Sequence, residues 1–228
     1  MNGASFVSGG LVPGEIATVF GANLTTATGI NLASTLPLAT QLTNVQVLVN
    51  GTAAPIFAVD NVNGQEQVNF QVPYEVAGLT TATVQVANNG SPGNTISVPV
   101  AAAQPGIFTY TVGATTYGAI LHANYQLANT SSPAVAGEAV QIFGTGLGAV
   151  TPLPADGAAA AGASPTVATV TVTIGGVQAS VAYAGLAPGN VGEYQVNVQV
   201  PSGLASGNQP VIIAIGGVQS SIALLPVQ

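Results

Sequence analysis

The sequence predicts an all-β protein built from two tandem β-sandwiches, and three observations lead to this prediction. Motifs of the first half of the chain recur in the second half. Turn dipeptides separate short runs rich in Val, Ile and Thr, and helical periodicity is hard to find anywhere. The length of 228 residues suits one large all-β domain or two domains of about 100 residues each. The internal repeat favours two.

This repeat organises the whole chain. Pro13–Leu24 and Ala136–Leu147 both carry Gly-Glu, an alternating apolar run, Phe-Gly and a leucine, at an offset of 123 residues. Three further pairs of blocks follow in the same order, at offsets of 125, 128 and 127 residues: Val45–Gly51 with Val170–Gly176, Gln67–Pro73 with Gln195–Pro201, and Val84–Val100 with Val211–Val227. Four blocks in one order with slowly drifting offsets indicate a duplicated module with small loop insertions.

Each block of the repeat predicts a β-strand, because β-branched residues fit a pleated, half-buried surface. Dipeptides typical of tight hairpin turns separate these strands: Asn50-Gly51, Asn89-Gly90, Gly175-Gly176 and Gly216-Gly217. The Ala-rich stretch Ala155–Ala163 contains two glycines and lies between prolines, so we expect a loop there.

The domain boundaries follow from the limits of the repeat. We expect one sandwich over residues 1–103 and another over residues 131–228. Residues 104–130 have no partner in the repeat and are predicted to form a β-rich connector, with short strands Ile107–Val112 and Tyr117–Leu121 around Gly113. The connector is too apolar to remain in water, so we expect it to pack between the two modules.

The motifs also resemble a known family. The segments GASF, VPGEIATVFG, QPGIFT, AGEAVQIFGTGLGAV and YQVNVQVP are similar to an uncharacterised secreted C-terminal domain family of acidobacterial, Solibacter-type proteins, and the resemblance covers nearly the whole chain. The second module also resembles the immunoglobulin-like IPT/TIG group in its Phe-Gly-x-Gly-Leu turn and Gly-Gly hairpin. These resemblances imply an immunoglobulin-like fold and a secreted or cell-surface location, and they imply no catalytic residues.

The composition excludes several classes of function. The chain has seven acids, one histidine and no Lys, Arg, Cys or Trp, where an average chain of this length carries roughly 25 to 30 basic residues. Nucleic-acid binding, which needs a basic patch, is therefore not expected. Thiolate chemistry and Cys-type metal sites are excluded. No apolar run approaches the roughly 20 residues of a membrane-spanning helix.

Four features of the sequence are candidate sites of chemistry, and none is predicted to be catalytic, cofactor-binding or metal-binding. Glu15 and Glu138 occupy equivalent repeat positions, where we expect each carboxylate to accept backbone N–H groups in a turn. The segment Asp60–Glu66 has oxygen ligands at alternate positions, as in a calcium loop. However, Asn63-Gly64 equally predicts a hairpin turn. His122 is expected to be a structural histidine of the connector, since no nucleophile-elbow motif is present.

The aromatic residues are the remaining candidates. Phe20 and Phe143 are equivalent in the repeat, as are Phe70 and Val198, and all four are expected in the core. The better candidates for an exposed sugar-binding surface are four tyrosines: Tyr74, Tyr110, Tyr117 and Tyr125.

The function expected from these observations is structural and non-enzymatic. Soluble β-proteins protect their edge strands with charges, especially lysine, and seven acids must serve every edge of this chain. Such edges favour pairing with another copy, in an extracellular filament or surface layer made of this protein alone. The alternatives are an adhesive or carbohydrate-binding module that recognises surface glycans, and a passive spacer domain of a larger surface protein.

Overall fold

The computed structural model describes all 228 residues, which form an all-β protein without any α-helix. The strands of the first half are β1 (Ile16–Gly21), β2 (Gly29–Leu32), β3 (Val45–Val49), β4 (Thr52–Ala53), β5 (Ile56–Val62), β6 (Gln65–Gln71), β7 (Thr81–Asn88) and β8 (Ser91–Pro99). The 3-10 turn η1 (Tyr74–Val76) follows β6. No helix in the structure has the length and apolar character needed to cross a membrane.

The connector region and the second half contribute the other strands. These are β9 (Gly106–Ile107), β10 (Thr109–Val112), β11 (Thr115–Gly118), β12 (Ile120–His122), β13 (Ala139–Thr145), β14 (Ser164–Pro165), β15 (Val170–Ile174), β16 (Val177–Leu186), β17 (Tyr194–Gln199), β18 (Gly207–Ile215), β19 (Val218–Gln219) and β20 (Ala223–Val227). All four blocks of the repeat are strands in both halves, as predicted.

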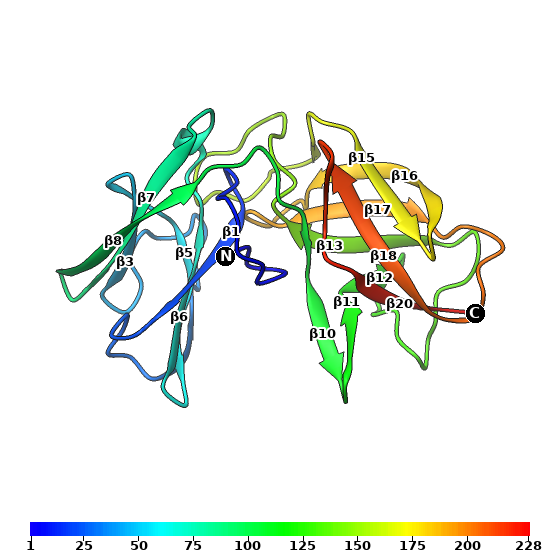
Figure 1. Cartoon of the computed structure of the whole chain (residues 1–228), viewed down its shortest axis with the longest axis horizontal. Helices are drawn as coiled ribbons and strands as arrows, with labels where there is room; N and C mark the ends of the chain where they lie inside the picture. Colours follow the sequence, from blue (N-terminus) through cyan, green and yellow to red (C-terminus); the bar gives the residue numbers. More distant parts are fainter.

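The first half consists of two small antiparallel sheets. One has the strand order β1-β6-β5-β2 and the other β4-β3-β7-β8. Alternate residues of both sheets point between them and form one apolar core, in which Val47, Val68 and Phe70 are buried. In Figure 1 this half lies on the left, with its two sheets seen nearly edge-on.

The second half contains one larger sheet of twelve strands that curves into a nearly closed barrel around the larger core. Its main path runs β10-β11-β20-β18-β15-β16-β17-β13-β12. The ten-residue strand β16 closes the curve, because it pairs with β15 at its start and with β17 from Ser180 onward, with a register shift between Val181 and Tyr183. The corresponding segment of the first half is split into β4 and β5 around Pro55, which has no N–H to donate to a ladder.

The two halves repeat the same strand orders. The path β1-β6-β5 recurs as β13-β17-β16, and β3-β7-β8 recurs as β15-β18-β20. The predicted hairpin turns are also present. Asn50 and Gly51 have φ angles of 50° and 82°, and Asn89 and Gly90 have φ angles of 50° and 75°, as tight two-residue turns require.

The connector strands become part of the second half. β9 and β12 both pair with β13, and β11 pairs with β20 in parallel. Ile107 and Ile120 are buried in the larger core. Close packing explains the Phe-Gly motif at this point, since a Cβ atom on Gly144 would lie 2.2 Å from the carbonyl oxygen of Gly106.

Polar contacts join the two halves directly. The hydroxyl of Thr145 accepts a hydrogen bond from the backbone N–H of Ile16 at 2.9 Å and donates one to the carbonyl of Gly192 at 2.7 Å. Gln71 accepts the N–H of Gly157 at 2.6 Å, and Asp156 accepts the N–H of Tyr74 at 3.1 Å. The Ala-rich loop, irregular as predicted, therefore lies against the first half.

Candidate functional site

The most distinctive surface of the second half is the outward face of β13 and β17. Val140 and Ile142 of β13 point into the core, so Phe143 points outward and is half-buried. Gln195 of β17 lies directly opposite Phe143, and Asn197 follows on the same face. The expectation that Phe143 belongs to the core was therefore wrong, because strand alternation places it on the other face.

Two tyrosines extend this surface into a groove of about 490 Å³. Tyr183 of β16 lies opposite Asn197, and its hydroxyl donates to the carbonyl of Leu186 at 2.8 Å. Tyr125, in the loop after β12, has 72% of its surface exposed. We call this set the second-half platform; it consists of Tyr125, Phe143, Tyr183, Gln195 and Asn197.

The amides of this platform are prearranged and carry spare hydrogen-bonding capacity. The side-chain N–H of Gln195 donates to Oδ1 of Asn197 at 2.8 Å. This leaves the Gln195 carbonyl and the Asn197 amino group free for other partners. Gln141 of β13 lies directly opposite Asn197 of β17, and its side-chain Oε1 is buried without a hydrogen-bond partner. The groove itself is lined by aromatic, small apolar and amide side chains, without an acid.

The first half carries a smaller copy of the same arrangement. Phe20 lies opposite Gln67, and the Gln67 side chain donates to Oδ1 of Asn69 at 3.3 Å. Phe20 is 39% exposed, so its expected place in the core was also wrong. Phe6 packs against it with ring centroids 6.0 Å apart. We call Phe6, Phe20, Gln67 and Asn69 the first-half platform. The repeated core positions Phe70 and Val198 are buried, as predicted.

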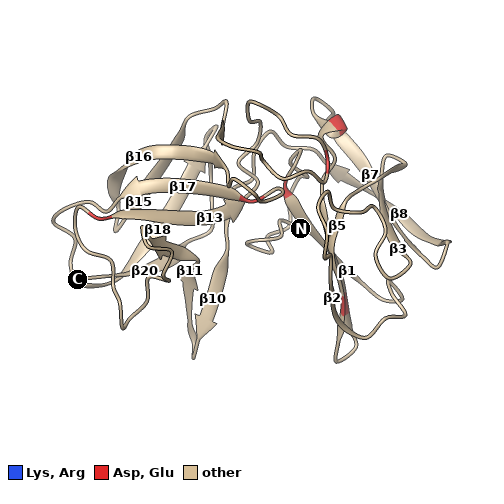
Figure 2. Ribbon diagram, turned by 180° about the vertical axis from the view of Figure 1, so that it is seen from behind, with Lys and Arg blue, Asp and Glu red and all other residues tan.

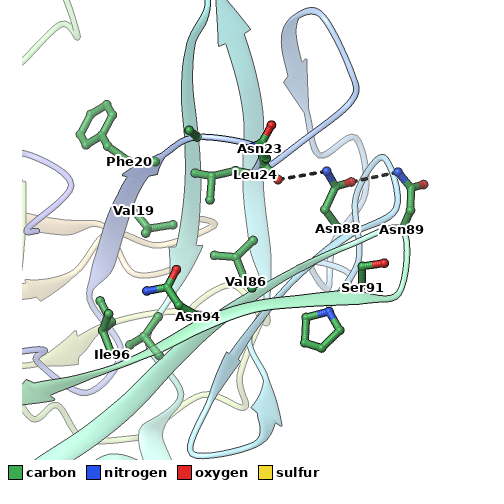
Figure 3. A pocket seen from close by; sticks show the side chains of 15 residues that line it. Val19, Phe20, Asn23, Leu24, Val86, Asn88, Asn89, Ser91, Asn94 and Ile96 are labelled. Carbon is green, nitrogen blue, oxygen red and sulfur yellow. Dashed lines mark hydrogen bonds between the residues drawn. The ribbon is translucent and has the colours of Figure 1, made fainter.

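A second hollow in the first half has a different character. It is a cavity of about 670 Å³ between β1 and β8, the edge strands of the two small sheets. Figure 3 shows Val19, Leu24 and Val86 pointing into it, whereas the ring of Phe20 points away to the other side of β1. Amides line one end, where the side-chain N–H of Asn88 donates to the carbonyl of Asn23 at 3.2 Å. We call this cavity the edge slot.

The two repeated glutamates have the turn geometry expected of them. Glu15 accepts the backbone N–H of Val12 at 2.9 Å, and Glu138 accepts that of Val135 at 3.0 Å. Their environments differ, however. Glu15 is buried and also accepts from the side chain of Asn2 at 3.2 Å. Burial raises the pKa of Glu15 to about 8, so this carboxyl is protonated at neutral pH.

His122 lies between the carboxylate of Glu138 and Ser132. Its Nδ1 lies 2.5 Å from Oε1 of Glu138, and its Nε2 lies 3.0 Å from the carbonyl oxygen of Ser132. The Ser132 hydroxyl is 3.3 Å from the same Nε2. The Ser132 carbonyl accepts a hydrogen bond from a protonated Nε2, whereas the Ser132 hydroxyl can donate one to an unprotonated Nε2. Hydrogen bonding to Glu138 raises the pKa of His122, because both ring nitrogens face acceptors.

The segment from Asp60 to Glu66 forms a β-hairpin. Its turn is Asn63-Gly64, with φ angles of 54° and 80°, as one reading of the sequence predicted. The Glu66 carboxylate accepts the backbone N–H of Leu24 at 2.5 Å and of Thr25 at 3.2 Å, which occupies it within the fold. No group of three or more His, Asp or Glu side chains gathers anywhere in the structure.

The other tyrosines proposed as surface residues are less accessible than expected. Tyr117 is buried where β11 meets β20, and it stacks on Tyr110 with ring centroids 5.6 Å apart. Tyr74 is half-buried at the junction of the halves, and its burial raises the pKa of the phenol to about 12. Of the four candidates, Tyr125 alone is prominently exposed.

Comparison with known proteins gives no family: no family model matches the chain, and no curated protein is similar to it. Its fold is distantly similar to several solved β-structures. One is the Bacteroides ovatus mixed-linkage glucan utilization locus protein SGBP-B in complex with a mixed-linkage heptasaccharide, at 13% identity and a TM-score of 0.30. That match covers all of this chain and 44% of the other, so this chain spans less than half of its length.

Two other solved structures show a similar distant likeness. A pair of tandem immunoglobulin domains of titin matches at 12% identity and a TM-score of 0.26, over 95% of this chain and 89% of the other. The C-terminal domain of the Streptococcus agalactiae AgI/II polypeptide BspA matches at 11% identity and a TM-score of 0.21, over 71% and 63%.

Proposed function

We propose that the protein is a non-catalytic, extracellular module that binds neutral glycans on the second-half platform. We also infer that its two halves are immunoglobulin-like sandwiches derived from one duplicated module, which accounts for the presence of two platforms. The observation that carries the proposal is the repeated Phe-Gln-Asn arrangement on the outward sheet faces, enlarged in the second half by Tyr125 and Tyr183.

Aromatic side chains supply the apolar part of this recognition. A sugar ring has an apolar face of C–H groups and an edge of hydroxyls. Tyr125, Phe143 and Tyr183 line one groove and offer large apolar surfaces that remain partly in water. Such residues give contact area at low conformational cost, because they have few rotatable bonds.

The amides supply the polar part. A hydroxyl both donates and accepts hydrogen bonds, and so does a primary amide. Gln195 and Asn197 already hold each other in place through one hydrogen bond. Their remaining donor and acceptor groups could therefore meet a sugar hydroxyl without first being ordered. Because the chain has no Lys or Arg, the platform offers nothing to neutralise an anionic sugar.

Affinity electrophoresis tests this proposal directly. The protein has a net charge of −7 and enters a native gel at neutral pH. We expect retardation in gels that contain a soluble neutral polysaccharide, with glucan, xylan and galactomannan tested separately. We expect free migration in gels that contain alginate or polygalacturonate.

Variants locate the site. Tyr125→Ala and Phe143→Ala should each weaken retardation about tenfold or more, as loss of a central aromatic contact does at other binding sites. The matched control is Ile222→Ala, which removes an apolar side chain that is 62% exposed and lies outside both platforms. Unhindered migration of the wild type in every neutral gel, or equal retardation of Phe143→Ala and wild type, would overturn the proposal.

A further inference from the structure

The edge slot of the first half has a filled counterpart in the second half. The repeat offsets equate Val19 with Ile142, Val86 with Ile213 and Ile96 with Ala223. Around these second-half residues, the connector strand β12 pairs with β13 and the connector strand β11 pairs with β20. The side chains of Ile120 and Tyr117 from these strands are buried there.

In the first half no connector covers the same place. Asn2 bridges to Ala17, and Leu11 bridges to Val100, so the N-terminal segment covers only one end of the opening. Beyond that end, β1 pairs only with β6 and β8 pairs only with β7. As a result, Ile96 is 46% exposed, whereas its counterpart Ala223 is 1% exposed.

The free edge of β8 is ready to pair with another strand. The backbone N–H of Val100 donates to the carbonyl of Thr80, and the register continues antiparallel from there. Hydrogen-bonded pairs alternate along an antiparallel ladder, so Ile96 and Val98 face β7. Thr95 and Ser97 therefore direct their N–H and C=O groups outward, where the structure shows no strand beside them.

The sequence of β8 lacks the charged residues that usually protect an edge. It spans nine residues, all but one of them exposed, and it contains no charged residue. Its two prolines, Pro92 and Pro99, lie near the two ends of the strand, and the register shift of the β7–β8 ladder lies between Pro92 and Thr95, so the stretch from Thr95 to Val98 has neither protection. Figure 2 shows that the few acids of the chain are scattered, and none of them lies on β8.

We propose that the edge slot is a homodimer interface, in which β8 of a second copy pairs antiparallel with β8 across a two-fold axis. One uncharged strand then serves as both donor and acceptor, as a two-fold interface requires. The second strand lies in the position beside β8 that β11 occupies beside β20. The direction differs, because β11 runs parallel to β20 and contacts it at Tyr117 and Leu224 alone, whereas a two-fold axis makes the β8 pair antiparallel. The second strand covers Val19, Val86 and Ile96. The second half shows that strands of this same chain fit such an opening.

Sedimentation velocity over micromolar to millimolar concentrations tests the dimer. The wild type is expected to pass from monomer to dimer, and Ile96→Asp should remain a monomer throughout. The control Ile222→Asp places the same charge at another exposed isoleucine and should dimerise like the wild type. Circular dichroism confirms that both variants are folded. A wild type that remains monomeric at every concentration would overturn the proposal.

Amide hydrogen exchange identifies the strand. In the dimer, exchange at Thr95 and Ser97 should slow with rising protein concentration, while exchange along the free edge strand β2 should not change. Concentration-dependent protection of β2 or β10 without protection of β8 would also overturn the proposal. Neither measurement involves a glycan, so its outcome is independent of the proposed binding function.

Discussion

Glu15 is the most unusual single residue of the chain, because it is a buried carboxyl without a basic partner side chain. Its hydrogen bonds come from the backbone of Val12 and the side chain of Asn2. Burial outweighs these contacts and raises its pKa from 4.5 to about 8. Between these two values the folded protein binds a proton that the unfolded chain releases. The free energy of unfolding therefore falls as pH rises through this range.

Replacement of Glu15 by Gln should remove this pH dependence. We expect the melting temperature of the wild type to fall between about pH 5 and pH 8, and that of Glu15→Gln to fall much less. The exposed Glu75→Gln is the control and should behave as the wild type. Thermal melts at matched ionic strength measure the slope. Equal slopes for wild type and Glu15→Gln would show that Glu15 is ionised in the fold.

His122 is the only histidine, so its proton NMR signals can be assigned without ambiguity. Its contact with Glu138 predicts a titration midpoint above the ordinary value of about 6.5. The stabilisation from this contact is complete below the unfolded pKa and is lost as pH rises through the folded pKa. Glu138→Gln should lower the midpoint. A wild-type midpoint at or below the ordinary value would contradict the contact.

Among the structural elements, the junction between β1 and β13 depends on the hydroxyl of Thr145. Thr145→Val preserves the shape but leaves the N–H of Ile16 and the carbonyl of Gly192 without this partner. We expect a loss of about 1–3 kcal/mol in the free energy of unfolding. The control Thr171→Val removes an exposed hydroxyl at 3.5 Å from its acceptor and should change little. Urea denaturation measures both, and equal stabilities would contradict the assigned role of Thr145.

The strands and hairpins could be predicted from sequence because each depends on local alternation and turn residues. The same alternation, applied strictly, would have placed Phe20 and Phe143 on the outward face. Ala17 and Val19, and likewise Val140 and Ile142, occupy the inward positions. The repeated phenylalanine shows that Phe20 and Phe143 occupy equivalent positions in the two halves. Equivalent positions can lie on either face of a sheet, so the repeat alone does not predict burial.

The connector and the platform were less accessible to prediction. β12 pairs with β13 through backbone hydrogen bonds, and no sequence motif predicts which strands pair in this way. The place of Tyr125 beside Phe143 depends on where the loop after β12 returns to the sheet. The burial of Tyr117 follows from its pairing opposite Leu224, more than a hundred positions away in the sequence. These are long-range contacts that periodicity does not encode.

The whole molecule should tolerate acid well. Burial raises the pKa values of Glu15, Asp60, Asp156 and Glu193, and the one ion pair involves His122. Carboxyls with raised pKa values favour the fold as pH falls, because the folded state binds their protons more readily. We expect the protein to remain folded at about pH 3, as judged by circular dichroism. An unfolding midpoint near pH 4 in an acid titration would contradict this.

The proposed dimer would also change binding by the whole molecule. Two copies would present four platforms on one dimer, and a long glycan that reached two of them would bind more tightly than one platform allows. Retardation of the wild type by glycan should therefore increase with protein concentration, as the dimer forms. In Ile96→Asp this increase should be absent, whereas retardation by single platforms should persist.

The central claim is that the second-half platform binds neutral glycans, and side-chain amide NMR tests it most directly. Titration with a soluble neutral oligosaccharide from the polysaccharide that retards the protein should shift the amide signals of Gln195 and Asn197. The Asn88 amide signal in the edge slot should remain unchanged. Shifts confined to residues outside the two platforms, or no shifts with any neutral oligosaccharide, would contradict the claim.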